Sequence, residues 1–337
     1  MNKKLMSIAV ASALALPVVN ANADAMSKPY GEVHMAFQRV AAGSANATYD
    51  IDGTSSKANK LGLKGSVDTN LLDAVAVYQI ELGFHNGKAL YGEFFERDTW
   101  VGLSSKSMGT IRGGTMATAW KSNSALVDPL FTTALEGRSG VVGGDSSNLT
   151  GGVSPTSGRA THAVRYDSPS FGGVKVSANY AFNPDTTQTD PMGLGVTWKA
   201  KGMAAFFNYQ STGKDKAAMK VGGKAMFGAF GVSGAYEIDQ GAIGGFKDSK
   251  MNELYLAGTY TMGATTFILN FGNAAESASG KKDNSTGFGL AVSQQLAKKV
   301  SMYAGYGTRS GGANAVDVNG VKYDKINALA VGMIAKF

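Results

Sequence analysis

The stretch Ala328–Phe337, ALAVGMIAKF, alternates small and apolar side chains along an extended strand and ends on an aromatic residue. One face of this strand carries Leu329, Val331, Met333, Ala335 and Phe337, and the other carries Ala328, Ala330, Gly332, Ile334 and Lys336. Chain termini usually fray and end in polar residues. A strand that stays apolar up to its last residue predicts a sheet without a free edge.

The N-terminal segment has the pattern of a secretory signal. Lys3 and Lys4 precede an apolar run, and Ala21-Asn22-Ala23 has the small residues of a cleavage site. We therefore expect residues 1–23 to be a cleaved signal peptide and residues 24–337 to be the mature domain. Without Lys3 and Lys4 the formal net charge falls from +7 to +5 over 314 residues (337 − 23). This positive charge is too sparse for a nucleic-acid-binding protein.

Hydrophobic periodicity from Tyr30 onward has a period of two, which indicates strands and not helices. In GEVHMAFQR, the apolar residues Val33, Met35 and Phe37 alternate with Glu32, His34 and Gln38. Such alternations run for about ten residues, which is the length of a strand that spans a membrane. The 45 glycines suit a strongly curved sheet, and the absence of cysteine means that the fold does not depend on disulfides.

The connections between these strands alternate in length. Long polar loops separate short turns, which lie at 66–70, 104–109, 167–173, 198–203, 227–231, 260–264 and 294–299. Seven short turns that join strands 2 and 3, 4 and 5, and so on to 14 and 15 imply sixteen strands. Short turns on one rim and long loops on the other are typical of outer-membrane β-barrels.

The hydrocarbon of a membrane requires such a sheet to close. Each unpaired backbone group costs several kcal/mol in a bilayer, so the last strand must pair with the first. Sixteen strands leave a water-filled lumen, and the positions expected to face it are polar: Glu32, Gln38, Lys60, Lys64, Gln79, Glu81 and Arg159. The sequence therefore predicts an all-β protein, a closed 16-stranded antiparallel transmembrane β-barrel with short periplasmic turns and long external loops.

Three hairpins resemble those of the general diffusion porins of Gram-negative bacteria. The segment at 57–84, KANKLGLKGSVDTNLLDAVAVYQIELGF, is similar to the family's strand–turn–strand signature, and the next hairpin, RDTWVGLSSKSMGTIRGG at 97–114, is similar to its successor. At 159–182, RATHAVRYDSPSFGGVKVSANYAF keeps the core of the family's third hairpin. The terminal Phe337 matches the signal that the family presents to the barrel-assembly machinery.

This resemblance implies a location, partners and a function. The family forms homotrimers in the outer membrane, among its lipids and lipopolysaccharide. Its members let small hydrophilic solutes and ions diffuse passively through a water-filled pore. On this basis we expect a general diffusion porin that has no cofactor and is not an enzyme.

The resemblance also implies a constriction. The family folds its third long loop into the barrel, and residues 121–158 form the longest connection here, in the matching place. The family's acidic loop motif is matched only at Asp145, and Glu136 and Asp128 are nearby acids that no motif fixes. We expect residues 121–158 to fold inward, as a third loop that narrows the pore.

Opposite this loop the family places a ladder of arginines on the barrel wall. Arg159 stands at one matching position, Lys60 replaces a second arginine, and Thr115 replaces a third. The resemblance therefore implies a pore with two wall cations and one matched loop acid, Asp145. We expect weak anion selectivity from this balance. An alternative is a substrate-selective channel, for oligosaccharides or phosphate, on the same barrel.

A third class of function is a rim enzyme or adhesin that uses the barrel only as an anchor. The three histidines, His34, His85 and His162, stand in no metal-binding pattern, and the chain has no G-x-S-x-G motif. We therefore predict no catalytic residues and no metal site.

Overall fold

The computed structural model describes residues 25–42, 48–50, 59–69, 71–85, 88–89, 97–133, 135–137, 158–182, 190–213, 216–240, 250–278, 281–311 and 325–337. Within these ranges it contains one helix, α2 (Ala119–Val127). The strands are β1 (Ala25–Ala42), β2 (Thr48–Asp50), β3 (Lys60–Asp68), β4 (Ala74–His85), β5 (Lys88–Ala89), β6 (Thr99–Ser105), β7 (Gly109–Ala117), β8 (Arg159–Asp167), β9 (Val174–Ala181), β10 (Met192–Ala200), β11 (Met203–Gly213), β12 (Lys216–Phe227), β13 (Phe230–Asp239), β14 (Lys250–Met262), β15 (Thr265–Ala278), β16 (Lys281–Ala297), β17 (Val300–Ser310) and β18 (Lys325–Lys336).

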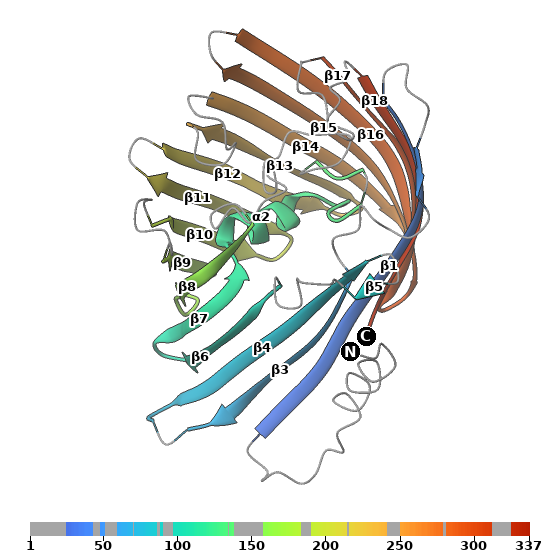
Figure 1. Ribbon diagram of the computed structural model, residues 1–337. Helices are drawn as coiled ribbons and strands as arrows, with labels where there is room; N and C mark the ends of the chain where they lie inside the picture. Colours follow the sequence, from blue (N-terminus) through green and yellow to red (C-terminus); the bar gives the residue numbers. More distant parts are fainter. Residues whose placement is uncertain are drawn as a thin grey trace, which may run out of the picture.

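Sixteen of these eighteen strands form a closed antiparallel ring (18 − 2), because β2 and β5 are short additions of three and two residues. Each long strand pairs with its neighbours in the ring, and β1 pairs with both β3 and β18 (Figure 1). The seven predicted short turns join β3 to β4, β6 to β7, β8 to β9, and so on to β16 and β17. The predicted fold class, a 16-stranded barrel, is confirmed.

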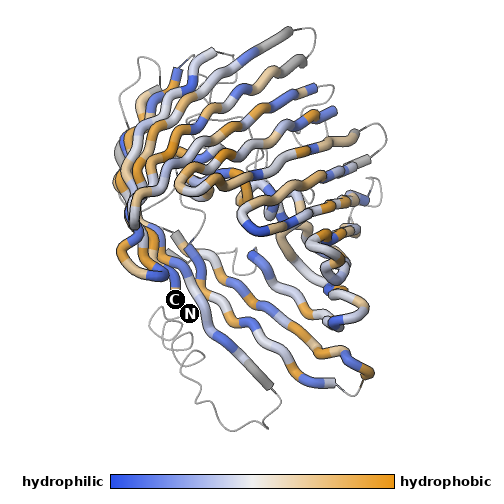
Figure 2. The backbone as a smooth tube through the Cα atoms, turned by 180° about the vertical axis from the view of Figure 1, so that it is seen from behind, coloured by the Kyte–Doolittle hydropathy of each residue, from blue (hydrophilic) through white to orange (hydrophobic). Residues whose placement is uncertain are grey.

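The two faces of the barrel wall differ in polarity, as the period of two predicts. Apolar and polar residues alternate along the strands (Figure 2). On β1, Met35 and Phe37 face outward and are 55% and 40% exposed, whereas Glu32 and Gln38 are buried on the inner face. An apolar outer face is what a strand needs against lipid. Among the described residues, no helix has the length and apolar character needed to cross a membrane.

The last residue of the chain lies at the seam where the barrel closes. The backbone N–H of Phe337 donates to the carbonyl oxygen of Gly31 at 3.1 Å, and the N–H of Gly31 donates to the carbonyl of Phe337 at 3.2 Å. The phenyl ring covers Gly31 so closely that a Cβ atom there would come within 2.2 Å of the ring. A glycine at this position therefore admits the terminal aromatic side chain.

We expect Gly31→Ala to lower the free energy of unfolding by about 1 kcal/mol, because the new methyl group displaces the Phe337 ring from the seam. The measurement is urea unfolding of the barrel in lipid vesicles. Gly258→Ala is the matched control, since Gly258 also lies in a strand and a Cβ there would meet no atom within 4 Å. Equal unfolding free energies for the two variants would contradict the conclusion that the Phe337 ring packs specifically against Gly31.

Candidate functional site

The helix α2 begins directly after β7 and lies inside the curve of the sheet, beside β10 to β13 (Figure 1). Thr118 starts the helix as its N-cap, and its hydroxyl oxygen accepts a hydrogen bond from the backbone N–H of Lys121 at 3.3 Å. A threonine cap satisfies one of the free N–H groups of the first turn. One face of the helix is buried, with Ala119, Trp120, Asn123, Ser124 and Val127 on it.

Polar contacts attach this buried face to three neighbouring strands. The Asn123 amide donates to Asn208 Oδ1 on β11 at 2.9 Å and accepts from Thr197 Oγ1 on β10 at 3.2 Å. On β13, Ser233 Oγ donates to the carbonyl oxygen of Val127 at 2.5 Å. These contacts fix both the position and the rotation of the helix on the inner wall.

The segment after α2 continues along the same wall. Asp128 Oδ1 accepts a hydrogen bond from the Tyr255 hydroxyl on β14 at 2.7 Å, and Oδ2 accepts from the N–H of Gly137 at 2.8 Å. Leu130 and Leu135 are 2% and 0% exposed and pack into an apolar cluster with side chains of β1 and β15 to β18. The described part of the loop therefore follows the inner wall from β10 to β18.

The two acidic residues in this part of the loop do not face open solvent. Glu136, which was predicted near the constriction, is 2% exposed, and its Oε2 accepts from the N–H of Thr132 at 2.6 Å. Asp128 is 4% exposed. Burial, and then the charge of Glu136, raise the pKa of Asp128 from 3.8 to about 7. Asp145, the acid matched to the family's motif, lies outside the described residues.

The opposite side of the lumen carries six charged residues, which we call the charged wall. Lys60 Nζ on β3 lies 3.8 Å from both Glu32 Oε2 on β1 and Glu81 Oε2 on β4. Arg159 on β8 places Nε 2.5 Å from Asp98 Oδ1 and Nη2 3.6 Å from Glu81 Oε1. The members of the charged wall are Glu32, Lys60, Glu81, Arg97, Asp98 and Arg159. Both predicted wall cations, Lys60 and Arg159, therefore lie in this one cluster.

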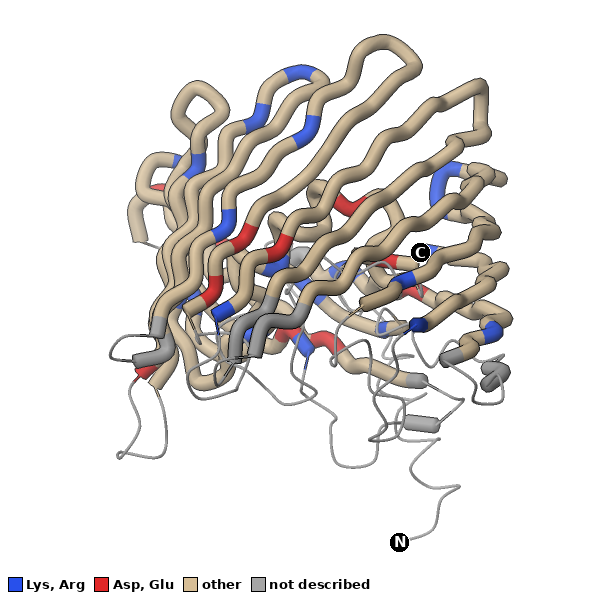
Figure 3. Tube along the Cα trace, turned by 90° about the horizontal axis from the view of Figure 1, so that it is seen from above, with Lys and Arg blue, Asp and Glu red and all other residues tan. Residues whose placement is uncertain are grey.

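Glu81 is the centre of the charged wall. Its Oε1 accepts a hydrogen bond from Arg97 Nε at 2.6 Å, and its Oε2 accepts from the Tyr30 hydroxyl at 2.9 Å. With three bases and three acids the cluster is formally neutral (3 − 3), and Figure 3 shows basic and acidic segments on neighbouring strands. The basic ladder of this pore is thus largely compensated by carboxylates.

Compensation is incomplete on the side that faces the lumen. The side chains of Lys60 and Arg159 are 26% and 17% exposed, whereas those of Glu81 and Glu32 are 5% and 10% exposed. Asp98 is the exception at 20%. Because more of the surface of the three bases than of the three acids is exposed, an ion in the lumen meets more positive than negative surface.

The helix α2 acts on the charged wall through Lys121. Burial opposes ionisation of Asp98, but the charge of Arg159, hydrogen bonds and the charge of Lys121 together hold the pKa of Asp98 below its usual 3.8. Lys121 therefore lies near enough to the charged wall to affect it electrostatically.

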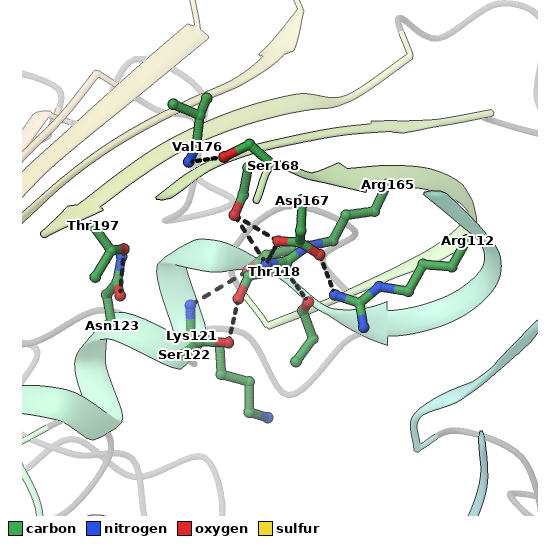
Figure 4. A network of polar contacts seen from close by, with 12 residues as sticks. Arg112, Thr118, Lys121, Ser122, Asn123, Arg165, Asp167, Ser168, Val176 and Thr197 are labelled. Atoms are coloured by element: carbon green, nitrogen blue, oxygen red, sulfur yellow. Dashed lines mark hydrogen bonds and ion pairs between the residues drawn. The ribbon is translucent and has the colours of Figure 1, made fainter. Parts of the chain in front are cut away.

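A second group of charges lies beside the start of α2, where Asp167 ends β8 (Figure 4). Arg112 pairs with Asp167, and Arg165 Nη2 lies 2.7 Å from the same carboxylate. Thr115, predicted to replace a wall arginine, is half-buried on β7 opposite Thr99 of β6. It has no charge to offer, so the cations of this region are Arg112 and Arg165.

Sequence reasoning missed the roles of Glu81, Arg97 and Asp98. Glu81 was placed on the inner face, but its contacts with bases from three other elements follow only from the register of the ring. The sequence offers one signal for this cluster: Arg97 and Asp98 are two adjacent charged residues directly before the start of β6.

Comparison with known proteins places this geometry in a family. A family model described as "Gram-negative porin" matches residues 8–314. The chain is similar in structure to the anion-selective porin from Comamonas acidovorans, with 19% identity, a TM-score of 0.77, and coverage of 93% of this chain and 100% of that one.

Two further solved structures share the fold. The trimer form of OmpT, an outer membrane protein of Vibrio cholerae, has 16% identity and a TM-score of 0.66, with 93% of this chain and 100% of that chain covered. OmpF of Salmonella typhi in complex with daunomycin has 13% identity and a TM-score of 0.65, with 92% and 97% covered. No match was found among curated proteins. The family match, the closed barrel of sixteen strands and the charged lumen together show that this chain belongs to the Gram-negative porins and forms a channel in the outer membrane.

Proposed function

We propose that this porin is a general diffusion channel with weak anion selectivity, and that it moves small hydrophilic solutes and ions passively without catalysing a reaction. The observation that carries the proposal is that the wall cations Lys60 and Arg159 are more exposed than the wall carboxylates Glu32 and Glu81. The burial of the loop acids Asp128 and Glu136 supports it, because a buried acid attracts no cation from the lumen.

The predicted constriction extends this proposal to residues 121–158. The position of α2 and of the residues after it, along the wall from β10 to β18, supports a loop that narrows the lumen. Lys60, Arg159 and Thr115 would line the neck on the wall side, and Asp145 on the loop side. Glu136, being buried, would act on the neck only by holding the loop in place.

The alternative, a channel selective for phosphate or oligosaccharides, has less support. A phosphate site needs guanidinium groups whose donors are free to bind both oxygens of the anion. Here Arg97 and Arg159 already direct donors at Glu81 and Asp98. We therefore favour discrimination by size and charge over a specific binding site.

Planar-bilayer recording tests the proposal. In a gradient of potassium chloride at about 0.1 M, where charges act over roughly 10 Å, we expect the reversal potential to show chloride permeating faster than potassium. Arg159→Gln should reduce this preference, because it removes one lumen-facing cation and leaves Asp98 uncompensated. A cation-preferring wild-type pore would contradict the selectivity, and block by one solute class at low concentration would favour the selective channel.

The assembly is a further part of the proposal. The trimer form of the Vibrio cholerae protein supports a homotrimer here as well. Three equal conductance steps for each insertion event would support this state, and single steps would oppose it. Contacts with outer-membrane lipids and lipopolysaccharide, and presentation of Phe337 to the barrel-assembly machinery, stay predictions.

A further inference from the structure

Lys220 is a fully buried lysine on the inner wall of the barrel. It lies on β12 and has a relative exposure of 0%, and Glu237, directly opposite it on β13, is 1% exposed. Lys220 Nζ lies 2.5 Å from Glu237 Oε1. Taking two charges out of water costs several kcal/mol for each ion, so this pair needs further partners to be stable.

The loop helix α2 supplies such partners. Lys220 Nζ donates to Ser124 Oγ at 2.6 Å and lies 4.6 Å from the centre of the Trp120 ring. Ser124 Oγ in turn donates to the carbonyl oxygen of Trp120 at 3.1 Å. Trp120 and Ser124 are themselves 1% and 0% exposed. We call these four residues, Trp120, Ser124, Lys220 and Glu237, the helix clamp.

The ion pair of Lys220 and Glu237 stays buried only while α2 is docked against the wall. The ammonium group is enclosed by Trp120 and Ser124 on the side of the lumen and by Glu237 on the side of the sheet. If the helix moved away, the pair would face the lumen and its contacts with Trp120 and Ser124 would be lost. The cation over the aromatic ring, an interaction that strengthens when water is excluded, exists only while α2 is docked.

We propose that Lys220 is a positioning residue for the pore: it holds the loop helix α2 against β12 and thereby sets the open width of the channel. This inference rests on the proposed function, since it concerns the width of the same pore. Glu237 neutralises the lysine, and Ser124 and Trp120 make the attachment specific for one position of the helix.

A set of variants tests the clamp. Lys220→Met leaves Glu237 buried without its cation, and Glu237→Gln leaves Lys220 without its counter-charge. Removal of one partner of a buried pair is strongly unfavourable, so each change should raise the ratio of undocked to docked helix by about 10²- to 10³-fold. The double variant K220M/E237L removes both charges of this pair, and we expect it to return within about tenfold of the wild type.

Two measurements report whether α2 is docked against the wall. The first is the time that single channels spend in a wider, noisier open state, which we expect to rise in both single variants and to fall again in the double variant. The second does not need conduction: Trp120 fluorescence, in a chain whose Trp100 and Trp198 are phenylalanine, should become accessible to iodide in the single variants. A wild-type barrel that fails to conduct would refute the proposed function, and the fluorescence would still decide the clamp.

Lys224→Met is the matched control, because Lys224 lies on the same face of β12 about 13 Å further along the strand. Lys224→Met removes the same positive charge, but Lys224 is exposed and lies outside the clamp. Ser124→Ala tests the loop side without changing the barrel and should shift docking by about tenfold. The proposal is overturned if Lys220→Met behaves like Lys224→Met in both readouts, or if the double variant is as open as the single ones.

Discussion

Replacing Glu81 by glutamine should raise the permeability ratio of chloride to potassium by roughly two- to fivefold, which corresponds to about 1 kcal/mol or less of added interaction for one charge near the ion path. The charged wall of the wild type has three bases and three acids, so the variant leaves it with a net charge of +1. Glutamine keeps the shape of the side chain and an oxygen that accepts from Tyr30. The change is therefore mainly electrostatic.

The central position of Glu81 explains why this single change should have a large effect. Its carboxylate lies within 3.8 Å of Lys60 and 3.6 Å of Arg159, the two predicted wall cations, and accepts a hydrogen bond from Arg97. Neutralising it strengthens the field of all three bases at once. The measurement is the reversal potential in a potassium chloride gradient near 0.1 M, because at 1 M the screening length falls to about 3 Å.

Asp68→Asn is the control for the general loss of a negative charge. Asp68 ends β3 and lies about 26 Å along the strand from Lys60, well beyond the screening length at 0.1 M. We expect its reversal potential to stay close to that of the wild type. If Glu81→Gln also left the reversal potential unchanged, the charged wall would not lie at the selective part of the pore.

The sequence was sufficient for the barrel because the membrane constrains it so strongly. Alternation with a period of two placed Glu32 and Gln38 inside and Met35 and Phe37 outside, and the seven short turns fixed the number of strands. Closure followed from the cost of unpaired backbone groups in hydrocarbon. Each of these inferences uses local sequence and one global condition, so no knowledge of side-chain contacts was needed.

To predict the contacts of the charged wall, one needs the pairing register between strands that are joined by long loops. Glu32 pairs with Lys60 across β1 and β3, and Lys60 pairs with Gly83 across β3 and β4. The short turn between β3 and β4 fixes the second register, but nothing local fixes the first. The sequence therefore indicated that Lys60 and Arg159 face the lumen but did not show that carboxylates pair with them.

The interior of the loop was still less predictable. The matched motif pointed to Asp145, and Glu136 was added only for its proximity in sequence. The contacts that attach the described loop use Asn123, Ser124 and Asp128, ordinary polar residues with no family pattern around them. Their roles depend on which strands α2 crosses, and that is a property of the whole barrel.

The free energy of unfolding should fall as pH rises from 4 to 8, and Asp128 should account for about 4 kcal/mol of the change. The pKa of Asp128 is raised from 3.8 to about 7 by burial and, second, by the charge of Glu136. Asp128 lies in the loop and outside the membrane-spanning strands. The folded protein therefore binds more protons than the unfolded chain between these two values, and such a group stabilises the fold less as pH rises.

The upward shift in the pKa of Asp128 determines the pH range over which its contribution to stability is lost. The contribution is fully present below about pH 3.8, where both states are protonated, declines by about 1.4 kcal/mol for each pH unit, and is lost above pH 7. Urea unfolding in neutral lipid vesicles at a series of pH values gives the slope. Asp128→Asn cannot ionise, but it loses one acceptor for the Gly137 N–H, which costs about 1–3 kcal/mol. It should be less stable than the wild type at pH 4 and more stable than the wild type at pH 8, because the wild type has by then lost about 4 kcal/mol.

The difference between wild type and Asp128→Asn isolates this one carboxyl from other groups that titrate in the same range. Asp68→Asn should follow the wild-type slope, because Asp68 is exposed at the end of β3 and is not part of the loop. Parallel pH curves for the wild type and Asp128→Asn would show that Asp128 is already charged at low pH. The loop would then be held by an ionised carboxylate that accepts from Tyr255 and Gly137, and not by a neutral acid whose attachment weakens as it ionises.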